Sequence, residues 1–204
     1  MTRTLVYLHG LFLCLLLASC ATTRTQPIPL QQTQTAISWE NRVQTLSSIQ
    51  SWDLNALIAM RTKKDAMSAS WKWQQTKNNY TMSLYGPLGA GAMKLSGSPG
   101  HVSLETSDGK HYTATSPESL LSQQLGWNIP VSNLYFWIRG LPAPNQAAHK
   151  ELDNQNRLAL LKQDGWTIQY LNYKKFGSLD LPAKLVLDNI DLNVKIIVRQ
   201  WTTL

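Results

Sequence analysis

Apolar and polar residues alternate along two long stretches of the chain, one on each side of a central segment. The alternation begins near Trp52 and is clearest where Lys72 separates Trp71 from Trp73. A period of two puts apolar side chains on one face of a strand, which is typical of antiparallel sheets with one solvated face. The apolar positions are Ala69, Trp71, Trp73, Tyr80, Met82, Leu84, Met93, Leu95, Val102, Leu104, Trp166, Ile168, Tyr170, Leu185, Leu187, Val194, Ile196 and Val198.

Short polar segments separate these runs and predict tight turns. Lys77-Asn78-Asn79, Ser107-Asp108-Gly109 and Asp164-Gly165 each lie between two apolar runs. Asn, Asp and Gly are favoured there because they tolerate the positive φ angles of hairpin turns. The stretches before and after the central segment are therefore predicted to be β-hairpins.

Three segments have a helical period instead, and the pattern predicts helices over about 38–50, 116–126 and 132–139. The first two ranges begin with serine, a good N-cap, and Pro117 suits the first helical position. Gly126 suits the end of the second helix.

Strands, two helices and strands again predict a mainly β (α+β) fold, a curved antiparallel sheet with helices on its apolar, concave face. Lys72, Ser83 and Lys94 are expected on the opposite face. The same apolar residues could also form a closed core, and the pattern alone leaves both alternatives open. The residues expected to face the concavity are Trp73, Tyr80, Met82, Leu84, Met93, Leu95, Trp166, Ile168, Leu185, Leu187 and Ile196 from the strands, with Leu134, Trp137 and Ile138 from the third helix.

The amino end has the features of a signal peptide. Arg3 precedes an apolar run over 5–17, which is shorter than the roughly 20 residues that span a membrane. The run ends in Leu-Ala-Ser before Cys20, which resembles the bacterial lipobox. We expect a signal peptide over 1–19, a lipidated Cys20 with a flexible tether over 20–37, and one domain over 38–204. The alternative is an ordinary secretory signal with a chance cysteine.

Cysteine content agrees with export and lipidation. The sequence has two cysteines, and Cys14 would be removed with the signal peptide, so the mature chain would have neither a free thiol nor a disulfide. Ala21 follows Cys20. In lipoproteins of Gram-negative bacteria an aspartate at this position usually means retention in the inner membrane, so we expect lipid anchoring in the outer membrane, facing the periplasm.

The chain is basic, with a net charge of +7 that falls to +6 when Arg3 is removed. Its positive residues are scattered and form no basic run of the kind that binds nucleic acid. The excess charge either solubilises the surface or attracts anionic lipid or an acidic partner. The 8 Trp and 7 Tyr residues fill a core or line a cavity for an apolar ligand.

The sequence contains no recognisable catalytic or metal-binding motif. The histidines that survive cleavage, His101, His111 and His149, have no metal-ligand spacing, and there is neither Gly-x-Ser-x-Gly nor a glycine loop followed by Gly-Lys-Ser/Thr. Asp188 and Asp191 flank a predicted turn and are expected to form it. We therefore expect no enzyme, no metal and no cofactor.

The segment Pro87-Leu88-Gly89 is unusual for a turn. It is predicted to be a hairpin tip, where polar residues normally lie, yet it contains a leucine. Leu88 either projects from the tip or folds back onto the sheet.

Several short motifs, in this order, resemble the LolA/LolB-like family, and within it the outer-membrane lipoprotein receptors. The resemblance covers nearly the whole chain, and the order and spacing of the motifs are more specific than any one of them. The motifs are Trp73-Gln74-Gln75-Thr76, Tyr80, Pro87-Leu88-Gly89, Tyr112-Thr113-Ala114, Ile129-Pro130, Trp137-Ile138-Arg139-Gly140-Leu141-Pro142, Leu152-Asp153, Arg157-Leu158, Gly165-Trp166 and Tyr170.

The resemblance implies an incomplete antiparallel β-barrel, closed on one side by helices around a cavity for acyl chains. It also implies a monomeric receptor that takes lipoproteins from the periplasmic carrier LolA and inserts them into the outer membrane without consuming a nucleotide. In that family the leucine of the Pro-Leu-Gly tip protrudes and matters for delivery, which implies this role for Leu88, flanked by Pro87 and Gly89. Other members carry charged residues after the tip, where this chain has Ala90-Gly91-Ala92.

Two other functions stay open from the sequence. One is a structural envelope lipoprotein that binds peptidoglycan or an assembly complex, and the other is a receptor for other lipids. A filled core would favour the structural role, whereas an open apolar cavity would favour a receptor.

Overall fold

The computed structural model describes residues 36–89 and 91–204. The predicted signal peptide, Cys20 and all of the predicted tether except its last two residues lie outside this range, as does Ala90. Ala36–Leu204 forms one compact unit. None of the helices in the described part of the chain is long and apolar enough to cross a membrane.

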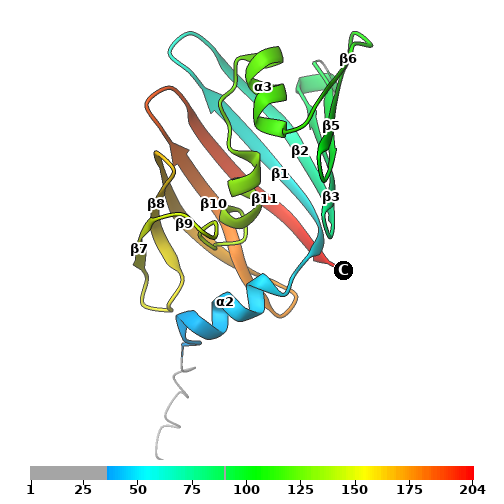
Figure 1. The fold of residues 1–204 in the computed structure, drawn as a ribbon. Coiled ribbons are helices and arrows are strands. Elements are labelled where there is room, and N and C mark those ends of the chain that lie inside the picture. The colour runs from blue at the N-terminus through cyan, green and yellow to red at the C-terminus, as the bar shows by residue number, and fades with distance from the viewer. Residues whose placement is uncertain (1–35, 90) are drawn as a thin grey trace, which may run out of the picture. The chain divides into compact units, whose positions relative to one another are not determined.

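One antiparallel sheet of 11 strands forms the unit, in the order β6-β5-β4-β3-β2-β1-β11-β10-β9-β8-β7 (Figure 1). The sheet is not closed, because β6 and β7 are its two edges. The strands are β1 (Ser51–Arg61), β2 (Ala66–Thr76), β3 (Asn79–Tyr85), β4 (Met93–Ser98), β5 (His101–Thr106), β6 (His111–Ala114), β7 (Ala148–Leu152), β8 (Leu158–Gln163), β9 (Trp166–Phe176), β10 (Leu179–Asp188) and β11 (Asn193–Thr203).

The two meanders join at the centre of the sheet, where the first strand pairs with the last. Ile58 of β1 lies opposite Ile196 of β11, and both side chains face the same buried side. The predicted turns are present between β2 and β3, β5 and β6, and β8 and β9. Asp164 and Gly165 both have positive φ, 52° and 74°, as a two-residue hairpin with right-handed strand twist requires.

The helices lie close to their predicted ranges. α2 (Trp39–Ser47) has Ser38 as N-cap, and α3 (Pro117–Leu125) has Ser116. Gly126 ends α3 in the left-handed conformation, which is the usual glycine C-cap. α4 (Val131–Trp137) begins one residue before the predicted Ser132. In Figure 1, α3 and the segment that follows it cross the concave face of the sheet, and α2 lies at one end.

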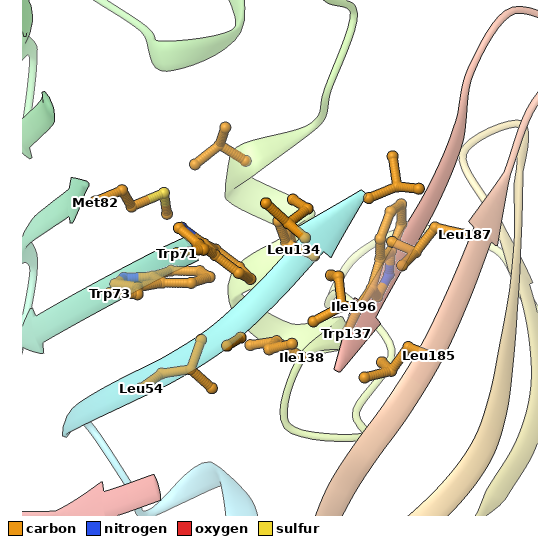
Figure 2. Close-up of a cluster of buried hydrophobic side chains, with 14 of the residues drawn as sticks. Leu54, Trp71, Trp73, Met82, Leu134, Trp137, Ile138, Leu185, Leu187 and Ile196 are labelled. Carbon is orange, nitrogen blue, oxygen red and sulfur yellow. The ribbon is translucent and has the colours of Figure 1, made fainter. Parts of the chain in front are cut away.

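The predicted strand faces are confirmed. Lys72 and Lys94 are exposed and Ser83 is half-buried, whereas Trp73, Met82 and Leu95 are buried and Tyr80, Leu84 and Met93 are partly buried against the core. The hydrophobic core lies between the concave face and the segment from α3 to α4, with Trp71, Trp73, Leu134, Trp137 and Ile196 among its members (Figure 2).

Candidate functional site: an apolar cavity and an exposed loop

The core is not completely filled. A cavity of about 60 Å³ lies between the concave face of the sheet and α3, α4 and the connection between them. Its wall is apolar throughout, which suits hydrocarbon and excludes a charged ligand. The wall consists of Ile58, Met60, Trp71, Met82, Leu84, Met93, Leu95, Leu104, Leu121, Trp127, Ile129, Pro130, Val131, Leu134, Trp137, Trp166, Leu187, Val194 and Ile196.

Most residues that the sequence assigned to the concavity line this cavity. They come from both halves of the sheet and from α4, and Figure 2 shows several of them converging from the strands and the helix. They are Met82, Leu84, Met93, Leu95, Leu134, Trp137, Trp166, Leu187 and Ile196.

Trp73 and Tyr80 do not line the cavity, contrary to the sequence-based expectation. They border a separate, partly polar groove at the end of the sheet near the turn between β2 and β3. The Nε1 of Trp73 donates a hydrogen bond of 2.9 Å to Oε1 of Gln75. The Tyr80 ring lies over Gly97, where an added Cβ would come within 2.2 Å of the ring. Gly97 thus gives Tyr80 space to lean across β4, away from the cavity.

Ile138, Ile168 and Leu185 are also wrongly assigned to the cavity. All three are completely buried and belong to the packed core. Because none of the three is exposed and none lines the cavity, the core is filled around them. Facing the concave side is therefore necessary for lining the cavity but not sufficient.

The cavity wall also contains residues that were not assigned to it from the sequence. Trp71 lies two residues before Trp73, on the same face of its strand, and Ile58 and Met60 are likewise two apart. The strand pattern therefore already places these side chains on the inner face. The connection between α3 and α4 adds Trp127, whose position carries no periodic signal because it lies outside any helix or strand.

Hydrogen bonds attach α4 firmly to one half of the sheet. The indole Nε1 of Trp137 donates to Oε1 of Gln163 on β8 at 2.8 Å, and Tyr170 on β9 donates its hydroxyl to the Trp137 carbonyl at 3.0 Å. Gln163 also exchanges two hydrogen bonds of 2.8 Å with the backbone of Ala143. Because these groups are buried, each unmade bond would cost about 1–3 kcal/mol, and α4 is held in place.

α3, which covers the cavity together with α4, is attached to the sheet differently. In the described part of the chain, no hydrogen bond joins a side chain of α3 to a strand. Glu118 of α3 accepts one from the backbone N–H of Ser132 at 2.8 Å, and Ser116 and Ser119 bond to each other. Leu120 and Leu121 hold α3 to the sheet by apolar contact, which is non-directional and tolerates sliding.

A buried arginine connects α2 to α4. Arg139 is 1% exposed, and its Nη1 donates to the carbonyls of Leu46 and Ile49 at 3.0 and 2.8 Å. Its guanidinium lies 4.2 Å from the ring centroid of Tyr135. Burial lowers the pKa of Arg139 from 12.5 to about 10, so the group is still protonated at neutral pH. The cation satisfies carbonyls at the C-terminal end of α2, which the helix dipole makes electronegative.

The Pro87–Gly89 tip forms a single 3-10 turn between β3 and β4. Leu88 is 108% exposed and has a left-handed backbone, φ 56° and ψ 23°. The alternative in which Leu88 folds back onto the sheet is therefore wrong. The backbone conformation costs a non-glycine residue of order 1 kcal/mol, so the leucine contributes neither to the core nor to a relaxed turn.

Two buried phenols predict loss of stability at alkaline pH. Tyr170 and Tyr173 donate to the carbonyls of Trp137 and Leu158, and burial raises the pKa of each above 10.0. Their contribution is complete below the unfolded pKa near 10 and is lost as pH rises through the folded pKa. Between about pH 10.5 and 12 each should lower the free energy of unfolding by about 1.4 kcal/mol per pH unit.

Urea unfolding of the unmodified chain and of Tyr173→Phe over this pH range measures the effect. In the variant, the free energy of unfolding should fall less steeply with pH, by about 1.4 kcal/mol per pH unit. The titration of Arg139 is common to both proteins and cancels in the difference. If the free energy of unfolding fell equally steeply with pH in both proteins, Tyr173 would already ionise in the folded protein over this pH range.

The described residues contain no group of three or more His, Cys, Asp or Glu side chains that could hold a metal ion. The indole Nε1 of Trp137, a residue of the cavity wall, is already bonded to Gln163.

Comparison with known proteins agrees with this geometry. Residues 50–201 match the family described as outer membrane lipoprotein LolB. The chain is 44% identical over 163 residues to the outer-membrane lipoprotein LolB of Pseudomonas syringae pv. syringae, which covers 80% of each chain. It is 40% identical over 186 residues to that of Pseudomonas paraeruginosa, covering 91% of this chain and 90% of the relative.

Solved structures show the same fold at low identity. A LolA superfamily protein from Nitrosomonas europaea aligns with a TM-score of 0.55 and 9% identity, over 83% of this chain and 94% of that one. This likeness confirms the open antiparallel sheet with helices on one face. The extent and identity of the sequence matches show that the chain belongs to the family of outer-membrane lipoprotein LolB, and is thus a lipoprotein of the outer membrane.

Proposed function

We propose that this protein accepts lipoproteins from the periplasmic carrier LolA and inserts them into the outer membrane, holding their acyl chains in the apolar cavity. The observation that carries the proposal is the wholly apolar wall between the concave face and α3–α4. Cys20, which lies outside the described residues, would carry the lipid that anchors the receptor.

The energetics explain why such a receptor is needed. Exposing three acyl chains, together about 45 methylenes, to water would cost on the order of 36 kcal/mol at ~0.8 kcal/mol each. The chains must therefore pass directly from one apolar surface to another. Such a transfer needs no catalytic step, metal or cofactor, and it must run downhill from the carrier to the receptor to the membrane.

The cavity wall suits weak, adaptable binding. Met60, Met82 and Met93 contribute to it, and methionine side chains have three rotatable bonds that let them fit irregular surfaces. A wall that packed an acyl chain too closely would hold it against release. Flexible side chains make apolar contact with an acyl chain and still allow its release.

The cavity must widen to receive an acyl chain. A cavity of about 150 Å³ holds only a benzene molecule, and this one has about 60 Å³. Because α4 is hydrogen-bonded to β8 and β9 whereas α3 is held by apolar contact, we propose that α3 and residues 126–130 move outward over β2–β5. Hydrocarbon entering there would replace the apolar contacts that α3 gives up.

Delivery is assigned to the Pro87–Gly89 tip. The last paired residues before and after this loop are Leu84 and Met93, and both line the cavity. The loop with exposed Leu88 therefore starts at the edge of the cavity. Acyl chains leaving past the loop end of the β3–β4 hairpin would meet the membrane where Leu88 enters it.

Filling the cavity tests the proposal. Met93→Trp puts a larger ring into the wall of the small cavity, so uptake of cargo from a loaded carrier should fall at least about tenfold, a loss of roughly 1.4 kcal/mol. The free energy of unfolding should stay the same or rise, because filling a cavity commonly adds about 0.5–2 kcal/mol. Native mass spectrometry of the chain after incubation with loaded LolA measures uptake directly.

The matched control is Ser96→Trp, which adds an indole to the opposite face of the same strand. It should leave uptake unchanged. Equal uptake by both variants would exclude the cavity as the acyl site. Uptake of free lipid but not of lipoprotein by the unmodified chain would instead identify a receptor for other lipids.

A further inference from the structure

The convex face of the sheet carries an apolar strip beside the Pro87–Gly89 tip. Leu57 on β1 lies opposite Ile197 on β11, and Tyr85 lies two strands away in the same cross-strand row, through Ser70 on β2. Tyr85 and Ile197 are 41% and 40% exposed. Together with Gly86, Pro87 and Leu88 these residues border a shallow hollow of about 390 Å³. The strip and the tip thus form one continuous exposed surface.

Four lysines surround this strip. Lys72 and Lys94 lie in the next cross-strand row, each opposite Ser83. Lys184 lies opposite Ile197, and Lys195 lies opposite Ala59 on the other side of the strip.

Within residues 36–89 and 91–204, these four cations have no fixed anionic partner. All are exposed, and among the described residues none of their ammonium groups lies within 4.0 Å of a carboxylate. Lys72 instead lies 6.0 Å from the ring centroid of Tyr85. One carboxylate lies near the four lysines: Glu105 on β5 is the cross-strand neighbour of Lys94. The surface is therefore net positive around an apolar centre.

We propose that this convex face is the surface with which the protein lies on an anionic phospholipid bilayer. The apolar strip and Leu88 would enter the interfacial region, while the lysines extend their alkyl stems along the strip and place their ammonium groups among the headgroups. This deepens the proposed function, on which it rests, by naming the membrane surface that receives the cargo. The arrangement also brings the cavity edge at Leu84 and Met93 close to the lipid.

The ring of lysines favours a lipid surface over an acidic protein. A lipid surface accepts positive charges wherever they lie, whereas a folded acidic partner would need carboxylates placed to match four lysines on four strands. The strip is shallow and open, without a deep pocket for an anchoring side chain. Lipid headgroups can adapt to such a surface because they move independently of one another.

Binding to vesicles tests this surface. The mature chain 20–204 with Cys20→Ala keeps the whole compact unit but cannot be acylated, so binding depends on the protein surface. Its sedimentation with phosphatidylcholine vesicles should rise when phosphatidylglycerol is included and fall as salt is added. Lys72→Gln with Lys195→Gln should weaken binding to the anionic vesicles about 30-fold, since each lysine near such a bilayer contributes a factor of about five.

The matched control is Lys174→Gln with Lys175→Gln, which removes the same charge near the turn between β9 and β10, at the other end of the sheet. This pair should bind nearly as well as the parent chain. Equal weakening by both pairs would overturn the proposal, because only net charge would matter. If Lys72→Gln with Lys195→Gln bound vesicles normally but received cargo slowly, the face would belong to the protein carrier.

The two proposals fail separately. If the unmodified chain binds anionic vesicles as expected but takes up no acyl cargo, the receptor function is wrong and the membrane surface stands. If it takes up cargo but both lysine pairs bind vesicles like the parent, the membrane surface is wrong. Circular dichroism of each variant checks the fold, and Lys94→Gln with Lys184→Gln repeats the test from the other lysines.

Discussion

Replacing Leu88 with glutamate is expected to slow release of cargo to liposomes on the order of 100-fold while cargo uptake continues. A leucine that enters an apolar phase contributes about 1.5–3 kcal/mol, and each 1.4 kcal/mol corresponds to about a factor of ten. A carboxylate loses that contribution and opposes entry into the lipid as well. Uptake should persist because Leu88 does not line the cavity.

The fold should tolerate this substitution. Leu88 is fully exposed, and exposed substitutions usually change the free energy of unfolding by no more than about 0.5 kcal/mol. Thermal unfolding, uptake from a loaded carrier and release to liposomes, measured on the same variant, separate folding, acceptance and delivery.

Leu204→Glu is the matched control. Leu204 is 76% exposed, and its N–H bonds to Ser51 at the opposite end of the sheet. The control should release cargo at the normal rate. Normal release by Leu88→Glu would show that the tip does not enter the membrane, and equal slowing in both variants would indicate a general effect of added negative charge.

Replacing Arg139 with alanine is expected to lower the free energy of unfolding by about 3–5 kcal/mol. The guanidinium donates to the carbonyls of Leu46, Ile49 and Tyr135. In the variant these acceptors lose their donor inside the protein, and each unsatisfied group costs about 1–3 kcal/mol. Removing the buried charge recovers part of its desolvation cost, which is why the total is smaller than the sum.

Urea unfolding and hydrogen exchange together measure this effect. Exchange should speed up over residues 39–50, because α2 loses its attachment to α4. Arg199→Ala, an exposed arginine on β11, is the control and should change stability by no more than about 0.5 kcal/mol.

Arg139→Met distinguishes hydrogen bonding from packing. It keeps much of the side-chain volume but offers no donor, so it should be nearly as unstable as Arg139→Ala. A stable methionine variant would contradict the assignment, since it would show that the site requires only an apolar side chain of the right size.

Local sequence was sufficient for the strands, their faces and most element ends. Trp71 and Trp73 alternate with Lys72, and only one strand orientation buries both indoles while leaving the ammonium in water. Asp164-Gly165 accepts positive φ at both residues, and Ser116 and Gly126 cap α3 at its two ends. These are effects between neighbours along the chain, so they can be predicted from spacing alone. β7 was missed because all five of its residues are exposed and it has no alternating pattern.

The sequence by itself thus determined the class of fold, the inward and outward faces and the unusual leucine at the tip. Only the tertiary structure decided that β1 pairs with β11, that Gln163 holds α4 to the sheet and that Arg139 joins α2 to α4. It also decided that a cavity remains beside Met82, whereas Ile168 is fully packed. The reason is physical: inward orientation depends on a residue's own strand, whereas empty space depends on the summed volumes and hydrogen bonds of segments far apart in the chain. Arg42 and the Asp180 carbonyl, for example, are 138 residues apart. No local pattern records that sum.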